Sequence, residues 1–153
     1  MSKDKSNIIS TNRKARHDYE IVSSIETGIV LTGTEVKSLR DGKANMADSY
    51  AKFTDGELWV FNLHISPYTK SAMENHEPLR NRKLLLHKLE LKKLMRQVDE
   101  KGVTLIPLKL YFKNHLVKLE LALARGKRKY DKRAAIAERD MKRDMDRNNK
   151  NRF

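Results

Sequence analysis

Short segments in which hydrophobic and polar residues alternate occupy most of the middle of the chain. The segment 17–25 places Tyr19, Ile21 and Ile25 on one face of an expected strand, and Gly28 after it predicts a tight turn. A period of two residues is that of a half-buried β-strand. The pattern therefore predicts a β-rich body.

Two hairpins follow from the same pattern. Asp55 and Gly56 are typical turn residues and separate expected strands over 49–54 and 58–65. A second turn, at residues 114–115, separates alternating segments over 103–113 and 116–124. The predicted inward faces of this second pair are Ile106, Leu108, Leu110 and Phe112 on one strand and Val117, Leu119, Leu121 and Leu123 on the other. Pro107 lacks an N–H group, so we expect its strand to lie at an edge or to carry a bulge there.

Two helices interrupt the strands. Thr34 is expected to cap a short helix near 34–41 that ends near Gly42. A second helix is predicted near 88–100. Its single apolar face consists of Leu91, Leu94, Met95 and Val98.

The fold class expected from these elements is mainly β, a closed antiparallel barrel of about six short strands with flanking helices. A β-sandwich is the alternative, because periodicity alone does not separate the two. We expect a flexible N-terminus over 1–11, the barrel over 12–124 and a basic tail over 125–153. The tail has few apolar residues, so it is predicted to be disordered when free and helical on binding, with a permanently docked helix as the alternative.

Charge is concentrated at the two ends of the chain. The formal net charge is +13 over 153 residues, of which residues 1–17 carry +4, residues 18–124 carry +2 and residues 125–153 carry +7. Such blocks favour a polyanionic partner, nucleic acid above all. The chain has no cysteine, no apolar segment of the length of a membrane span and no signal-peptide core. The cytosol is therefore the expected compartment.

Catalytic and cofactor motifs are not recognisable in the sequence. The segment 28–34 has the spacing of a phosphate-binding loop but lacks its lysine. The five histidines have no metal-ligand spacing, and the carboxylates are dispersed. We therefore expect no enzyme activity, no metal and no cofactor.

The aromatic residues divide into two expected groups. The alternation assigns Trp59, Phe61, Phe112, Tyr19 and Tyr50 to core faces. Tyr68, Tyr111 and Tyr130 are the better candidates for exposed contacts, because base stacking needs an accessible ring.

Six motifs together resemble those of the small protein B family, the SsrA-binding proteins of bacterial trans-translation. They are NRKARHDY at 12–19, GTEVKSLR at 33–40, DSYA at 48–51, RKLLLH at 82–87, PLKLYF at 107–112 and GKRKYDKR at 126–133. Their order and spacing match over residues 10–150. The resemblance implies an oligonucleotide-binding (OB) fold that binds the tRNA-like domain of transfer-messenger RNA and delivers it to stalled ribosomes.

The resemblance also implies partners and site residues. The tail would probe the empty mRNA channel of the small subunit, near the decoding region. Elongation factor Tu and alanyl-tRNA synthetase would be indirect partners through the RNA, and the protein would be a monomer that binds no membrane. The implied RNA-binding residues are Asn12, Arg13, Lys14, Arg16, Glu26, Lys37, Arg40, Arg82 and Lys83. The implied ribosome-binding residues are His17, Gly126, Lys127, Arg128, Lys129, Tyr130, Asp131, Lys132 and Arg133.

Three other readings stay open on the residues alone. A general RNA-binding or single-strand-binding barrel would need exposed aromatic platforms. A ribosome-associated structural protein would also be small, basic and tailed. A nuclease would need clustered acids to hold metal ions.

Overall fold

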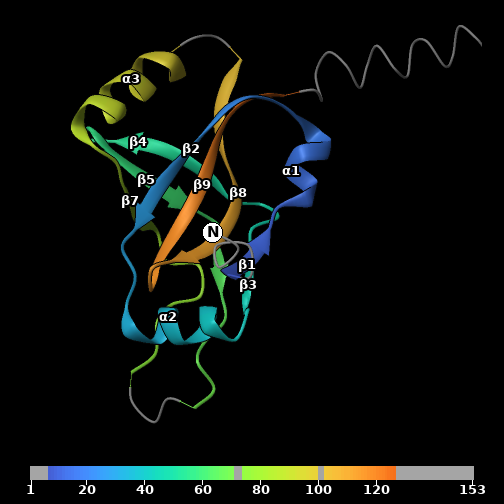
Figure 1. Cartoon of the computed structure of the whole chain (residues 1–153), viewed down its shortest axis with the longest axis vertical. Helices are drawn as coiled ribbons and strands as arrows, with labels where there is room; N and C mark the ends of the chain where they lie inside the picture. The colour runs from blue at the N-terminus through green and yellow to red at the C-terminus, as the bar shows by residue number, and fades with distance from the viewer. Residues whose placement is uncertain (1–6, 71–73, 100–101, 127–153) are drawn as a thin grey trace, which may run out of the picture.

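A closed barrel of six antiparallel strands forms the body of the molecule (Figure 1). The computed structural model describes residues 7–70, 74–99 and 102–126. The large sheet has the order β1-β8-β4-β5-β7-β2-β9, and β8 also pairs with β9, which closes the ring. Its strands are β1 (Ile8–Thr11), β2 (Tyr19–Ile29), β4 (Tyr50–Thr54), β5 (Glu57–Phe61), β7 (Arg82–Leu85), β8 (Val103–Lys113) and β9 (Leu116–Gly126). Ring closure confirms the predicted barrel over the sandwich.

The smaller elements surround this ring. A two-stranded sheet joins β3 (Ala44–Asn45) to β6 (His64–Ile65). The helices are α1 (Arg13–Asp18), α2 (Gly33–Arg40) and α3 (Lys88–Val98). Figure 1 shows α1 beside the barrel, α2 at its lower end and α3 at its upper end. No helix in the described part of the chain is long and apolar enough to cross a membrane.

Aliphatic residues from every strand of the ring fill the barrel. Leu58, Val60, Leu84, Leu119 and Leu121 are each at most 2% exposed. The inward face predicted for β9 is confirmed, because Val117, Leu119, Leu121 and Leu123 all belong to this core. Leu94 of α3 is buried in the same core, so α3 closes one end of the barrel.

A bulge in β8 corrects the face predicted for that strand. The register shifts between Pro107 and Lys109, as expected for a bulge beside a proline. Leu110 faces the barrel core, whereas Ile106 and Leu108 lie in a second apolar cluster with Ala15 of α1. The extra residue reverses the alternation, so the predicted single face is wrong.

β2 shows the same change of face. Its register shifts between Ile21 and Ser23. Tyr19 and Ile21 pack in the cluster under α1, whereas Ile25 packs against the barrel core. The prediction that these three residues share one face is therefore wrong, and residues 17–18 are helical.

Gly28 lies inside β2 and forms no turn. It pairs with Leu85 of β7, and a Cβ atom at residue 28 would lie 3.2 Å from the Leu85 Cβ. The glycine is therefore explained by close approach of two strands. Both predicted hairpin turns are confirmed, with positive φ at Asp55, Gly56, Asn114 and His115.

Several element boundaries differ from the predicted ones. The N-cap of α2 is Thr32, two residues before the predicted Thr34, and the Thr32 N–H donates to Glu35 at 2.8 Å. Residues 8–11, expected in a flexible N-terminus, pair with β8. β9 includes Arg125 and Gly126, so the barrel extends two residues into the predicted tail. The rest of that tail, 127–153, lies outside the described residues, and its helix on binding stays a prediction.

The aromatic residues are less buried than predicted. Phe112 packs against the barrel core and Tyr19 against the cluster under α1, in agreement with the expectation. Trp59 and Phe61 alternate with the inward Leu58 and Val60, so they lie half-buried on the outer face of β5. Tyr50 is 39% exposed. The core assignment of Trp59, Phe61 and Tyr50 is therefore wrong.

Candidate nucleic-acid interface

A carboxylate with two donors marks the outer face of β2, β9 and β8. Glu26 of β2 accepts a hydrogen bond from the Tyr111 hydroxyl of β8. The Lys113 Nζ lies 3.4 Å from both carboxylate oxygens. The Tyr111 hydrogen bond and the charge of Lys113 lower the pKa of Glu26 below its ordinary 4.5, so the carboxylate is ionised at neutral pH. Burial and the same hydrogen bond raise the pKa of Tyr111, which keeps the phenol protonated.

β9 runs between these residues and completes the face. Its register places Glu120 beside Glu26, and Lys118 beside Tyr111. Arg16 of α1 lies 3.8 Å from Glu120, which joins the face to that helix. We call Glu26, Lys109, Tyr111, Lys113, Lys118 and Glu120 the mixed-charge face. Lysines there can contact phosphates, while carboxylates can accept from base amino groups or 2′-hydroxyls.

Asn12 is a structural residue of α1. Its side chain is 3% exposed and caps the helix by accepting from the Ala15 N–H at 3.1 Å. Its amide donates to the carbonyls of Met46 at 3.1 Å and Pro107 at 2.8 Å. Asn12 is therefore not on the exposed surface where it was expected, and both N–H groups of its amide are used within the protein.

The other predicted residues of α1 are exposed and lie together. Arg13, Lys14, Arg16 and His17 extend from one short helix, and the His17 side chain is 89% exposed. Lys14 forms an exposed ion pair with Asp48 at 3.1 Å. Gly126 pairs with Tyr19, the residue that follows α1. The fold thus brings residues 13–17 beside the point from which the predicted tail extends.

A cavity of about 290 Å³ lies beside α1. Lys14, Tyr19, Asp48 and Tyr50 are among the residues that line it. Polar and aromatic groups therefore meet where α1 passes β4. Within the described ranges, no three histidine or carboxylate side chains are grouped to hold a metal ion.

Arg82 is buried, contrary to its expected place on the RNA-facing surface. It is 0% exposed, pairs with Glu35 of α2 and donates to the Leu63 carbonyl at 2.7 Å. Arg80 donates to the other oxygen of Glu35 at 2.6 Å. Burial raises the pKa of Glu35, but the bonds from Arg80 and Thr32 and the charge of Arg82 outweigh it, so the pKa is lowered. Arg82 therefore holds α2 against β7, and its side chain is not on the surface where it was expected.

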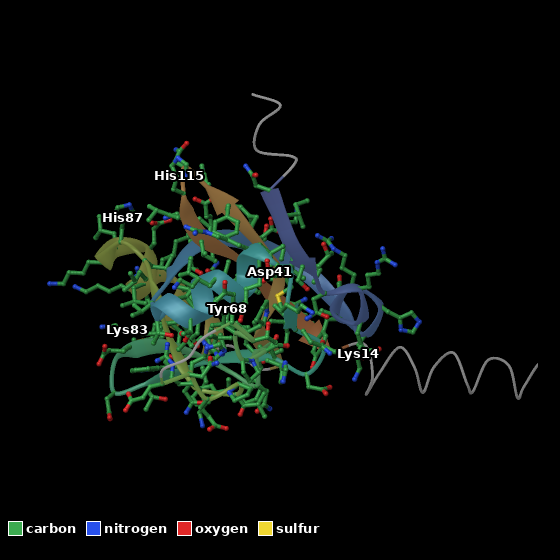
Figure 2. All side chains as sticks on the ribbon, turned by 90° about the horizontal axis from the view of Figure 1, so that it is seen from below. Lys14, Asp41, Tyr68, Lys83, His87 and His115 are labelled. Carbon is green, nitrogen blue, oxygen red and sulfur yellow. The ribbon has the colours of Figure 1, made fainter. Side chains whose placement is uncertain are left out.

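The other predicted cations occupy separate places. Lys37 and Arg40 are exposed on α2, and the Lys37 Nζ lies 5.7 Å from the centre of the Tyr68 ring. Lys83 is on the outer face of β7 in an ion pair with Glu57. Figure 2 shows Lys14 and Lys83 on opposite sides of the view, with Tyr68 between them. The predicted cations on α1, α2 and β7 therefore do not form one continuous patch in this view.

Sequence reasoning omitted three lysines of the mixed-charge face from its site list. They are Lys109, Lys113 and Lys118. The alternation along β9 correctly predicts that Lys118 faces outward, so this lysine could have been included. Lys109 and Lys113 require the phase of β8 after its bulge, which the sequence did not locate. Residues 127–133, predicted to bind the ribosome, lie outside the described residues.

Known proteins resemble this chain in sequence and in fold. A family model described as SmpB protein matches residues 9–151. An SsrA-binding protein of Acetivibrio thermocellus is 52% identical over 153 residues, covering 100% of this chain and 99% of the relative. One of Sulfurihydrogenibium sp. is 55% identical over 139 residues, 91% of each chain. A chain in the solved structure named "tmRNA-SmpB: a journey to the center of the bacterial ribosome" has TM-score 0.68 and 54% identity, covering 82% of this chain and 88% of that one.

Proposed function

This chain belongs to the SmpB protein family, and we propose on that premise that it binds transfer-messenger RNA and acts with it on the ribosome. The similarity spans almost the whole chain in both sequence and fold. Its role would be trans-translation, the rescue of stalled ribosomes with tagging of the incomplete peptide. The tRNA-like domain of the RNA is the part that the barrel would bind.

The observation that carries the proposal is Glu26, a carboxylate held by two donors on the mixed-charge face. A basic protein that bound RNA only as a polycation would gain nothing from an acid on its contact surface. Here the Tyr111 hydroxyl and the Lys113 ammonium hold that acid ionised and oriented. An oriented acceptor among lysines suits a folded RNA that presents 2′-hydroxyls and base edges beside phosphates.

Further contacts are assigned by exposure. Arg13, Lys14 and Arg16 extend the RNA surface along α1, and Lys37, Arg40 and Lys83 contribute from α2 and β7. His17 and Gly126 would face the ribosome together with residues 127–133. Because α1 adjoins the end of β9, one side of the molecule would approach the decoding region while the tail enters the mRNA channel.

The remaining parts of the proposal concern chemistry and location. The chain would make and break no covalent bond and would need no cofactor. Alanyl-tRNA synthetase and elongation factor Tu would meet it only through the shared RNA. The place of action would be the bacterial cytoplasm, where ribosomes translate, and the working form would be a monomer.

Binding across a salt series tests the proposal. Purified protein is titrated with transfer-messenger RNA and with bulk tRNA, and the dissociation constants are compared as salt rises. Recognition of shape predicts that the preference for transfer-messenger RNA persists at high salt. Equal affinities that fall together would leave only a general RNA-binding protein.

A shortened chain tests the division between barrel and tail. Truncation after Gly126 keeps every pair of β9 with β2 and β8. RNA affinity should stay within a few fold of the full chain, while peptide tagging on stalled ribosomes is lost. A large loss of RNA affinity would make the tail a primary RNA-binding arm and overturn this division.

A further inference from the structure

The outer face of β4, β5 and β7 carries aromatic rings between lysines. The strand register places Lys52 opposite Trp59, and Trp59 opposite Lys83, in one row across three strands. In the next row Tyr50 is opposite Phe61. We call these five residues the aromatic–lysine face.

The rings on this face are accessible and ordered. Tyr50 and Phe61 stack with centroids 5.3 Å apart and planes at 17°. Tyr50 is 39% exposed, and Trp59 and Phe61 are half-buried. None of the three belongs to the barrel core or to the cluster under α1. Packing of those two clusters therefore does not account for three large rings in adjacent rows.

The charges beside the rings indicate which partner fits. Lys52 is exposed on one side of Trp59, and the Lys83 side chain is 40% exposed on the other. Lys83 pairs with Glu57 at the margin of the face, and an exposed pair of this kind contributes little energy, so the lysine can turn to a phosphate. Rows on one face of a strand are about 7 Å apart, so neighbouring bases can each meet a ring.

We propose that the aromatic–lysine face binds unpaired RNA nucleotides, with bases stacked on Trp59 and on the Tyr50–Phe61 pair and phosphates beside Lys52 and Lys83. Flat rings with flanking cations are the combination used for single-stranded nucleic acid. The carboxylate of Glu57 lies at the margin of these rings and pairs only with Lys83 among the described contacts, so the face would be tolerant of sequence. The inference does not rest on transfer-messenger RNA as partner, because it concerns any accessible single strand.

Trp59 provides the measurement, because it is the only tryptophan in the chain. Tryptophan fluorescence is followed while an unstructured oligouridylate of about eight nucleotides is added to the full chain. Stacking should quench the signal in a saturable, salt-dependent way. The double variant Lys52→Gln/Lys83→Gln should bind at least tenfold more weakly, and Tyr50→Ala about tenfold more weakly.

Matched variants keep the result interpretable. Lys88→Gln/Lys92→Gln removes the same charge from exposed positions of α3 and should change the affinity much less. Trp59→Phe, followed with a labelled oligonucleotide, should retain binding because the ring is kept. Thermal unfolding of each variant confirms that it is folded.

The outcomes that overturn the inference are distinct from failure of the proposed function. If oligouridylate causes no quenching, or if the α3 control lowers its affinity as much as the Lys52→Gln/Lys83→Gln variant does, the oligonucleotide does not stack on this face. If an acidic peptide quenches the fluorescence and oligouridylate does not, the partner of this face is a protein and the inference is refuted. Glu26→Gln should weaken transfer-messenger RNA binding without changing oligouridylate binding.

Discussion

Two glutamates in this barrel have similar partners and opposite surroundings. Glu35 is 0% exposed and accepts from Arg80, Arg82 and the Thr32 N–H. The Glu26 side chain is 38% exposed and accepts from Tyr111 and Lys113. The pKa of each carboxyl is lowered, so both are ionised at neutral pH.

The difference in burial gives the loss of each glutamate a different effect on the stability of the fold. Removing one member of a buried pair leaves the other as an uncompensated charge in a low-dielectric interior. Water screens the exposed pair, so its loss has little effect on folding. The buried glutamate therefore holds α2 to β7, while the exposed one is available to a partner.

The largest expected effect comes from Glu35→Gln. This change leaves the Arg82 guanidinium buried without a counter-charge, so we expect the free energy of unfolding to fall by about 3–5 kcal/mol. Urea unfolding measures it, with Glu26→Gln as the matched control. Equal stability of the two variants would show that burial does not distinguish the two sites.

Acid unfolding sharpens the same comparison and is next in size. A carboxyl whose pKa is lower in the folded state adds stability above its unfolded value, and loses it as the pH falls through the folded value. For Glu35 and Glu26 this loss begins near the ordinary value of 4.5 and grows below it. The free energy of unfolding, measured with urea at a series of pH values, should depend less steeply on pH in this range in Glu35→Gln, and Glu26→Gln should change that dependence less. The reverse order would contradict the assignment.

Glu26→Gln, which should affect folding less than Glu35→Gln, should have the larger direct effect on RNA affinity. Glu26→Gln removes the charge of the acceptor, and hydrogen bonds to charged groups contribute about 1.5–3 kcal/mol. The affinity for transfer-messenger RNA should fall roughly tenfold to a hundredfold, while the free energy of unfolding changes by about 0.5 kcal/mol or less. Filter binding and urea unfolding of the same preparation give both values. Unchanged affinity would remove Glu26 from the RNA contact.

The smallest expected effect lies in the salt dependence of binding. Lys113→Gln and Lys118→Gln each remove one cation of the mixed-charge face. Each should lower the slope of log affinity against log salt by about one, with affinity lowered uniformly among RNAs. Lys92→Gln on α3 is the charge-matched control and should leave the slope unchanged. A slope unaltered in Lys113→Gln and Lys118→Gln would place the phosphates elsewhere.

The sequence predicted the barrel because most strands keep one phase of alternation. β9 alternates without interruption, so all four of its inward leucine and valine positions were correct. β8 and β2 each contain a bulge, and one extra residue reverses every face beyond it. The position of a bulge depends on the partner strand, which a single sequence does not display.

The site was less predictable for a related reason. Arg82 looks like its neighbour Lys83 in the sequence, yet one is buried and the other lies on the outer face. Glu35, 47 residues earlier in the chain, supplies the counter-charge for that buried arginine. Charge patterning gave the sign of the partner, whereas the paired geometry at Glu26 required the three-dimensional register of β2, β9 and β8.

Closure of the ring has a consequence for how the molecule is made. β2 pairs with β9 from Tyr19 opposite Gly126 to Gly28 opposite Lys118. One edge of the first long strand is therefore paired only after the last strand has been synthesised. During synthesis from the N-terminus, β2, β4, β5 and β7 leave the ribosome while the edge of β2 has no partner. A copy interrupted before residue 116 keeps that edge open to other chains or to proteases. Nearly complete translation is thus a condition for a closed barrel, and an incomplete copy is distinguished by its unpaired strand.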